Sequence, residues 1–504
     1  MNNKINELSS NIIESKKNLI ILSIFFIFFI AYFFTFEKGE NTHLKFEIVS
    51  LILLFITSSI IIIYSQNKNL EIHKIAFIIL LIFGLFCVFL NPVLFIPDEA
   101  EHYARSDLAS IGDFEPKFYN GYGYNIPQSF YQLNYQFGNT FFDGTISSDK
   151  ISNDITHYHS VFAHNPLFGY LISALGIYLA KMLDLSVIWS MWLGRLFNLI
   201  FYASICAYAI KKAPKYKIPL LIVSALPLAL SEGSSVSIDA ILNGLCILSI
   251  GMFIKIYESK TVENKDLALF FIPLLLSSMI KITNLAFLFL IFIIPRNKFK
   301  NKTQNYCKYL IFILIVIIGI VWCLKYSDPK YILSWRYIQY QFNGINATQQ
   351  LNYMLSHKTN TLHLFEHLIE RTYFLPVKFT QFYHLDWMSS SFILAPLYTI
   401  FFLFVCFLYP KEIKFKKRER IGVFLIICLF YFGTYLVQYL SWTNVGLSYF
   451  KGVNGRYFIP MLALLPMTLN ISPIKKSRKI DMLMITFAII FIIGFLIMVL
   501  SVYY

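Results

Sequence analysis

NPVLFIPDEAEHYARSDLAS, residues 91–110, places charged side chains directly after a long apolar run. Asp98, Glu99 and Glu101 come first, and His102 and Arg105 follow. An ionisable residue at the bilayer centre costs roughly 2.5–3.5 kcal/mol on insertion scales, so such residues tend to be functional or paired. If the apolar runs of this chain cross a membrane, the stretch therefore marks a polar site at the end of a spanning helix.

The composition indicates an integral membrane protein. Hydrophobic residues make up 57% of the 504 residues and charged residues only 14%, whereas ordinary globular domains carry about a quarter charged residues. The net charge of +15 comes from short basic clusters between apolar runs. This is how a positive-inside bias appears, so we expect no nucleic-acid partner. The seven cysteines lie in apolar runs or at their edges and predict neither a disulfide framework nor a metal site.

Many apolar runs are long enough for transmembrane helices, since a spanning helix needs roughly 20 residues. The long candidates are 19–36, 46–64, 75–94, 187–210, 237–256, 308–325, 391–409, 421–441 and 480–502. The shorter candidates are 217–231, 266–280, 283–295 and 457–471. The two short runs on either side of Lys281 could instead form one kinked span.

Four basic clusters set the predicted orientation. They lie at 211–217, 296–302, 411–420 and 475–479. If the apolar segment 166–183 crosses the membrane, the first cluster falls on the opposite side from the other three. If it lies in the outer leaflet, all four clusters face the cytoplasm, as lysines and arginines in short loops usually do. We therefore predict that 166–183 is a juxtamembrane helix.

The predicted fold class is an all-α polytopic membrane protein with about 13 transmembrane helices, juxtamembrane helices and two long outer loops. We expect it in the lipid bilayer of a bacterial inner membrane, with a cytoplasmic N-terminus and a periplasmic C-terminus. The predicted parts are three N-terminal transmembrane helices (1–94), a first periplasmic loop with the acidic motif and the juxtamembrane helix (95–186), a transmembrane core (187–325), a second periplasmic loop (326–390) and four C-terminal transmembrane helices (391–504).

Charged residues from distant segments reach one leaflet in this topology. They are Asp98, Glu99, Arg195, Asp239, Lys281 and Arg456. Several also have a structural explanation: Asp239 follows Ser237, a good helix N-cap, and an acid in the first turn suits the helix dipole. Lys281 could simply pair with Asp239, and Arg195 could be a structural residue of the bundle.

Transfer from a lipid-linked phosphosugar fits an acid beside cations at an outer membrane face. A carboxylate can serve as general base for an acceptor hydroxyl, and arginine binds phosphate oxygens bidentately. Arg456 follows Gly452 and Gly455, where the backbone can approach a ligand closely. His102 fits an orienting partner better than a metal ligand, because no second His/Asp pair has ligand spacing. We predict no cofactor and no metal ligands, although a divalent ion stays an open alternative.

Six motifs resemble, in order, the signature stretches of a bacterial family of multispanning proteins that is itself similar to the GT-C superfamily of polyprenyl-phosphate-sugar glycosyltransferases. The motifs are PDEAEHYAR (97–105), HNPLFGYL (164–171), RLFN (195–198), SVSIDAILNGL (235–245), HLDWMSSS (384–391) and WTNVGLSYFKGVNGRYFIP (442–460). The resemblance covers roughly residues 90–470 and leaves out the spans within 19–64.

The resemblance implies a GT-C-like fold whose first outer loop carries the catalytic acid. It assigns the base to the pair Asp98 and Glu99, with Asp98 as the first choice, and the donor phosphate to Arg456. The remaining expected substrate-binding residues are Glu101, His102, Arg105, Arg195, Asp239, Lys281 and Tyr457. In size and in the lack of a soluble domain, the chain resembles serotype-converting O-antigen glucosyltransferases of enteric bacteria and their phages.

The sequence thus predicts an inverting glycosyltransferase that moves a sugar, glucose by this resemblance, from a polyprenyl-phosphate donor to a surface glycan such as O-antigen on the periplasmic face. Two alternatives stay open. A polysaccharide polymerase or ligase would rely on loop residues such as Arg336, Arg371 and His384. A lipid-linked sugar flippase would need polar residues along a path to the cytoplasm, and the absence of an internal repeat counts mildly against a transporter.

Overall fold

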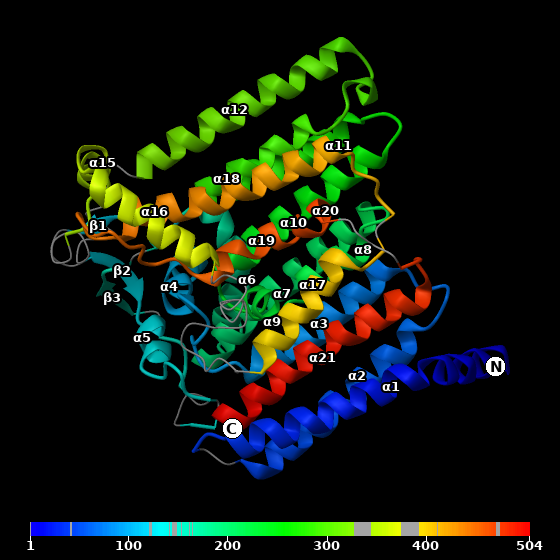
Figure 1. Ribbon diagram of the computed structural model, residues 1–504. Coiled ribbons are helices and arrows are strands. Elements are labelled where there is room, and N and C mark those ends of the chain that lie inside the picture. Colours follow the sequence, from blue (N-terminus) through cyan, green and yellow to red (C-terminus); the bar gives the residue numbers. More distant parts are fainter. Residues whose placement is uncertain are drawn as a thin grey trace.

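Long helices running side by side form the body of the molecule (Figure 1). The computed structural model describes residues 2–40, 43–119, 123–140, 142–143, 149–152, 154–160, 162–163, 165–326, 344–373, 393–410, 412–469 and 474–504. Eight of the described helices are long and apolar enough to cross a membrane: α1 (Asn2–Phe36), α2 (Leu44–Ser65), α3 (Ile72–Leu90), α7 (Val187–Lys212), α10 (Ile238–Glu258), α12 (Lys302–Tyr326), α18 (Lys417–Trp442) and α21 (Arg478–Tyr503). They fall on eight of the long runs, and the prediction of an all-α polytopic membrane protein is confirmed.

The other predicted spans occur as shorter or interrupted helices. They are α17 (Leu394–Phe407) within 391–409, α8 (Lys217–Ser224) and α9 (Pro227–Gly233) around 217–231, and η5 (Gly455–Phe458), α19 (Ile459–Leu462) and α20 (Leu465–Thr468) around 457–471. A proline stands in the first turn of α9, α19 and α20. Proline has no backbone N–H, so it begins a helix easily but cannot continue the one before it.

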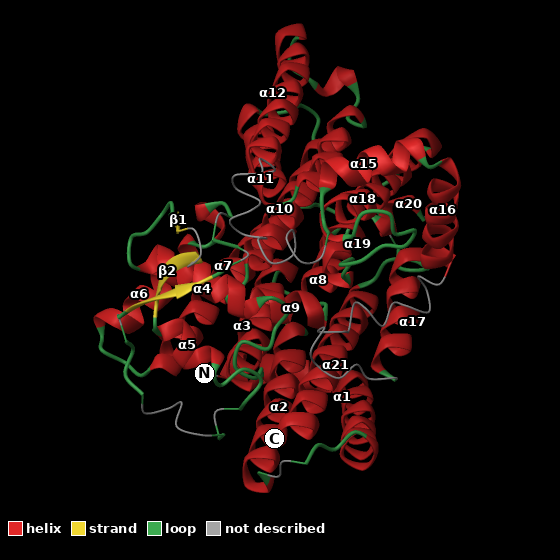
Figure 2. Ribbon diagram, turned by 90° about the vertical axis from the view of Figure 1, so that its left-hand side faces the viewer, coloured by secondary structure: helices red, strands yellow, loops and turns green. Residues whose placement is uncertain are grey.

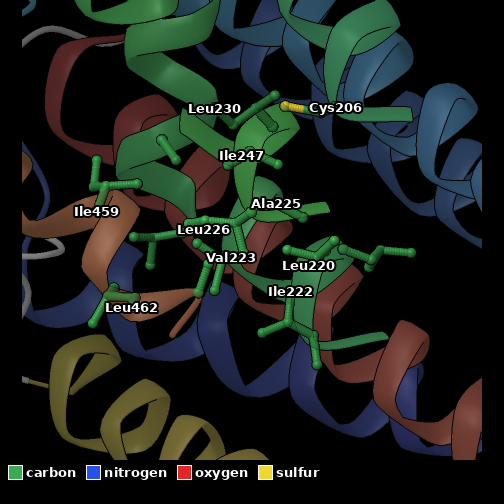
Figure 3. Close-up of a cluster of buried hydrophobic side chains, with 14 of the residues drawn as sticks. Cys206, Leu220, Ile222, Val223, Ala225, Leu226, Leu230, Ile247, Ile459 and Leu462 are labelled. Atoms are coloured by element: carbon green, nitrogen blue, oxygen red, sulfur yellow. The ribbon is translucent and has the colours of Figure 1, made fainter. Parts of the chain in front are cut away.

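Tyrosine hydroxyls satisfy carbonyl groups at two of these interruptions. Tyr202 donates to the Ser224 carbonyl at the end of α8, and Tyr216 donates to the Ala463 carbonyl between α19 and α20, both at 2.9 Å. No water in a bilayer core can bind a free carbonyl, so buried donors of this kind make a broken helix tolerable. Figure 3 shows the apolar packing around the break, with Leu220, Val223 and Leu226 in one buried cluster.

The segment around Lys281 forms a helical hairpin. Helix α11 (Asn264–Ile280) leads up to Lys281, and the 3-10 helix η2 (Ile282–Phe292) leads back. The start of α11 and the segment after η2 lie side by side at the other end of the hairpin. There the Val262 N–H, just before α11, donates to the carbonyl of Lys298 in η3 (Arg296–Lys298) at 2.9 Å. Residues 266–295 therefore make two passes rather than one kinked span, and Lys281 lies at the tip.

Both predicted loops contain regular structure. The first holds α4 (Glu99–Ser110), α5 (Ser129–Asn134), the 3-10 turn η1 (Leu167–Gly169), α6 (Leu171–Met182) and an antiparallel sheet of β1 (Phe118–Tyr119), β2 (Gly123–Pro127) and β3 (Ile155–Tyr158) in the order β1-β2-β3. Tyr124 of β2 pairs with Phe118 and with Tyr158. The described part of the second loop holds α15 (Ala347–Ser356) and α16 (Lys358–Tyr373).

The sheet and the short helices α4, α5 and α6 gather at one end of the long helices (Figure 2). Helix α4 is mostly buried there because Tyr103 and Leu108 pack into a second apolar cluster. At about 1.5 Å per residue, the 12 residues of α6 are too few to cross a bilayer. This agrees with the prediction that 166–183 is a juxtamembrane segment.

Members of the four basic clusters meet at the opposite end of the bundle. Lys215 pairs with Glu258 at 2.6 Å, and Lys476 pairs with Glu412 at 2.8 Å. The side chain of Lys298 donates to the carbonyl of Tyr257. Lys215, Lys298 and Glu412 line the same small pocket. The packing is therefore consistent with the prediction that all four basic clusters lie on one side of the membrane.

Candidate functional site

Asp98 is held in an unusual backbone conformation at the start of α4. Its φ of +58° lies in the left-handed region, which costs a non-glycine residue roughly 1 kcal/mol or more. Asp98 occupies the N-cap position, yet its side chain makes no capping hydrogen bond. The carboxylate instead accepts a hydrogen bond from Arg456 Nη2, and 40% of the side chain remains exposed. Backbone strain of this kind clusters at functional sites.

Arg456 is the centre of the charged cluster. The side chain is only 3% exposed and lies among three carboxylates. Glu232 Oε1 is 3.5 Å from Nη1, and Asp239 Oδ2 is 3.5 Å from Nε. Nη1 also donates to the Pro97 carbonyl at 2.6 Å, which ties η5 to the chain just before Asp98. We call Asp98, Glu232, Asp239, Lys281 and Arg456 the acid–base cluster.

Asp239 and Lys281 complete this cluster from two further elements. Ser237 caps α10 as predicted, accepting a hydrogen bond from the Asp239 N–H at 3.1 Å. Lys281 Nζ lies 3.7 Å from Asp239 Oδ1 and 3.4 Å from the centroid of the Tyr457 ring, a cation–π contact. The Lys281 side chain is 26% exposed. The structure thus places the predicted Asp98, Asp239, Lys281, Arg456 and Tyr457 together.

Glu99 and Arg195 form a separate, completely buried pair. Arg195 donates Nε and Nη2 to the two carboxylate oxygens of Glu99 at 2.7 and 2.6 Å. Its remaining three hydrogens go to the carbonyls of Val88, Asn91 and Pro92 at 2.8–3.0 Å. All five guanidinium donors are therefore used. This arrangement joins the end of α3, the start of α4 and α7, and favours the structural interpretation of Arg195.

His102 lies in the first turn of α4, and its backbone N–H donates to the carbonyl of Asp98 at 3.0 Å. Its Nδ1 is 2.9 Å from the hydroxyl of Tyr170, and its ring stacks on Phe162 at 4.6 Å between centroids. Burial lowers the pKa of His102 to about 4, although the nearby carboxylates of Asp98 and Asp239 act in the opposite direction. The imidazole is therefore neutral at physiological pH.

Asp98 is ionised at physiological pH. Burial of the carboxyl group raises the pKa of Asp98, but the positive charge of Arg456 and its hydrogen bond outweigh this and hold the pKa below its ordinary value. An ionised carboxylate that is partly open to solvent can accept a proton, whereas the carboxylate of Glu99 is occupied by Arg195 and by the Val236 N–H at 2.9 Å.

Glu101 and Arg105 contact the small sheet and the segments on either side of it. Glu101 accepts hydrogen bonds from Tyr158 and Ser160. Arg105 donates to the carbonyls of Phe114 and Asn165 at 3.1 and 3.3 Å. These contacts fix α4 against the outer layer, and the structure does not bring Glu101 or Arg105 into the acid–base cluster.

Glu232 is the member of the cluster that sequence analysis missed. Its side chain is completely buried at the end of α9, and Oε2 has no hydrogen-bond partner among the described residues. Its signal in the sequence is an isolated acid directly after the apolar run 217–231. Asn454 was also missed; its side chain accepts a hydrogen bond from the Arg456 N–H at 3.2 Å and orders η5.

Sequence analysis predicted no metal ligands but left a divalent ion open, and it assigned three loop residues to the polymerase or ligase alternative. Among the described residues, no group of three or more His, Cys, Asp or Glu side chains could hold a metal ion. The three acids around Arg456 surround a guanidinium instead. Arg336, His384 and the side chain of Arg371 lie outside the described residues.

A family model described as a predicted membrane protein, DUF2142, matches residues 81–465. The chain belongs to this family. Every residue of the acid–base cluster lies within the matched range, whereas α1 and α2 lie before it. This family description supports a multi-pass membrane location. Comparisons with curated proteins and with solved structures found no match.

Proposed function

We propose that the protein is an inverting glycosyltransferase that moves a sugar from a polyprenyl-phosphate donor to a glycan acceptor such as O-antigen at the periplasmic face of the inner membrane. The observation that carries the proposal is the pairing of Asp98 with Arg456. A partly exposed, ionised carboxylate stands beside a buried guanidinium, at the end of a helical bundle where a membrane-bound donor meets water.

Asp98 is suited to the role of general base. Its side chain makes no capping hydrogen bond to its own helix, and 40% of the side chain is open to an acceptor. Asp98 takes the proton of the acceptor hydroxyl, whose oxygen attacks the anomeric carbon. The bond from that carbon to the phosphate oxygen breaks, and the polyprenyl phosphate leaves with the electron pair. One displacement inverts the configuration, and positioned bases of this kind contribute about 10²–10⁴ in rate.

Arg456 and Lys281 are suited to binding the donor phosphate. Arginine presents two parallel N–H groups to phosphate oxygens, and lysine adds a compact point charge. Phosphate binding to Arg456 would also release Asp98 from its ion pair and leave the carboxylate free to accept the proton. Glu232 and Asp239 keep the two cations in place when no donor is bound.

The orientation of the molecule supports a periplasmic site. The acid–base cluster lies at the end of α3 and α11 and at the start of α10, whereas members of all four basic clusters lie at the opposite end. Basic loops usually stay in the cytoplasm, and this supports an outer location for the cluster. The fold class and the family model support the membrane location, and the donor, acceptor and linkage are part of the proposal.

The test is to determine the structure of the surface glycan in a deletion strain complemented with wild-type protein, Asp98→Asn or Asp184→Asn. Asp184 is a matched control, because it too has a left-handed backbone (φ +49°) in the outer layer but its side chain pairs with Lys150. We expect wild type and Asp184→Asn to add a side-branch sugar, and Asp98→Asn to add none at equal membrane expression.

Three outcomes would overturn the proposal. A normal branch in Asp98→Asn would place the base elsewhere. Altered chain length or lipid attachment with unchanged branching would indicate a polymerase or ligase. Movement of lipid-linked sugar across liposomes by the purified protein, without a new glycosidic bond, would indicate a flippase.

A further inference from the structure

A groove of about 880 Å³ opens on the side of the bundle at the basic end, between α12, η2 and α18. Helix α12 stands at the edge of the bundle in both views (Figures 1 and 2). The groove lies far along η2 from Lys281, so it is independent of the acid–base cluster. Its lining combines an apolar wall with a basic rim.

The apolar wall faces outward, where a membrane would contact it. Phe289, Phe292, Leu425 and Leu429 line it, and each is 40–60% exposed. Phe292 stacks on Tyr309 of α12 at 5.6 Å, and Phe289 packs edge-on against Phe312 at 5.1 Å. Large apolar side chains exposed at this end of a membrane protein are suited to contact with acyl chains rather than with a soluble ligand.

The basic rim consists of Arg296, Lys308, Lys416 and Arg418. The only acid lining the described groove is Glu419, and its carboxylate already accepts hydrogen bonds from the Tyr257 hydroxyl and the Lys416 N–H, both at 2.7 Å. The rim therefore carries four positive charges against one negative charge that is already engaged. Such an excess attracts an anion.

Lys308 is the second, independent sign of a ligand. Lys308 is only 2% exposed, and no carboxylate among the described residues lies within ion-pair distance of its ammonium group. Its ammonium lies over the rings of Phe299 and Tyr309 at 4.2 and 5.0 Å. A buried ammonium without a counter-ion is costly, so these contacts leave a place for an anionic group in the groove.

We propose that this groove binds one anionic phospholipid, with the headgroup phosphate at the basic rim and the acyl chains along the apolar wall. Basic pockets between transmembrane helices bind anionic headgroups in this way. The apolar wall selects a lipid over free phosphate, and the charge of the rim selects an anionic over a zwitterionic headgroup. The site links α12, which is otherwise peripheral, to the hairpin and to α18.

The experiment measures lipid binding by native mass spectrometry and the thermal unfolding midpoint of the purified full-length protein in detergent. Probes are phosphatidylglycerol, phosphatidylethanolamine with identical acyl chains, and inorganic phosphate. We expect phosphatidylglycerol alone to remain bound and to raise the midpoint. Arg296→Gln/Arg418→Gln, which changes two exposed rim residues, should weaken the apparent affinity by about tenfold or more.

Two further variants separate the proposal from general charge effects. Lys211→Gln/Lys260→Gln removes two exposed cations at the same end but outside the groove, and should bind phosphatidylglycerol like wild type. Leu429→Trp narrows the groove at its apolar wall without changing the charge, and should lower the affinity for phosphatidylglycerol. Equal loss in the rim and control doubles, equal binding of phosphatidylethanolamine, or an equal rise in midpoint with inorganic phosphate would each overturn the proposal.

Discussion

Asp98 and Glu99 are adjacent in the chain, but their carboxylates bind arginines from different parts of the molecule. Asp98 faces Arg456 and is 40% exposed, whereas Glu99 binds Arg195 and both side chains of that pair are fully buried. The backbone between them changes from left-handed at Asp98 to helical at Glu99, which turns the two side chains apart. The acidic pair therefore combines one carboxylate available for chemistry with one that holds the site together.

The first prediction follows from this division. Glu99→Gln leaves the buried Arg195 without its counter-charge, and breaking a buried pair costs roughly 3–5 kcal/mol. Asp98→Asn should cost less than about 1 kcal/mol, because the side chain is partly exposed and solvent screens its pair. Thermal unfolding of the purified variants measures the difference. Similar unfolding midpoints for both variants would contradict the assignment of Glu99 and Arg195 to a structural role.

The second prediction concerns the dependence of stability on pH. Burial lowers the pKa of His102 to about 4, against about 6.5 in the unfolded chain. Between these values His102 binds more protons in the unfolded state, so its contribution to stability rises with pH through this window and is lost as pH falls. The contribution is at most about 3.4 kcal/mol.

The measurement is the thermal unfolding midpoint from about pH 4 to about pH 7, because this interval covers the folded and the unfolded pKa of His102. His102→Gln should flatten the slope, whereas His363→Gln, at an exposed site on α16, should keep it. Asp98 does not add to the slope in this window. Burial raises the pKa of its carboxyl group, but the charge of Arg456 outweighs burial and holds the pKa below its ordinary value. The contribution of Asp98 to stability is therefore lost only at lower pH. An unchanged slope in His102→Gln would show that His102 is not the buried neutral group.

The third prediction tests the role of Lys281 in donor binding. If Lys281 contacts the donor phosphate, Lys281→Met should raise KM for the lipid donor by about tenfold or more, since a hydrogen bond to a charged group is worth roughly 1.5–3 kcal/mol. Lys281→Arg should recover part of the loss. Lys451→Met is the matched control, because Lys451 also lies over a tyrosine ring, that of Tyr449, but outside the cluster. A change in kcat alone would argue against phosphate binding.

Sequence patterns predicted the parts of this molecule that depend on local chemistry. Apolar runs, basic clusters and the cap at Ser237 are local signals, and they led to the fold class, the common side of the basic clusters and the start of α10. They also indicated that Asp98, Asp239, Lys281 and Arg456 reach one zone, because each stands at the end of a run. The structure places these four residues in one cluster.

The remaining features depend on contacts between distant segments. Whether Arg195 is free or fully engaged is decided by three carbonyls at the end of α3, which no pattern in RLFN reveals. The small sheet was missed because its strands are only two to five residues long. Glu232 stands at the polar end of an apolar run, and only the approach of Arg456 from η5 gives it a partner.

The last prediction concerns Glu232 as a positioning residue for Arg456. Glu232→Gln keeps the shape of the buried side chain but replaces the carboxyl oxygen that lies 3.5 Å from Nη1 or its partner oxygen with an amide group, so activity should fall about tenfold at unchanged expression, and Glu232→Asp should recover part of it. A double-mutant cycle with Arg456→Lys should be strongly non-additive, because the two residues are in contact, whereas the cycle with Asp184→Asn should be additive. Additivity in both cycles would mean that Glu232 supports only the packing of α9.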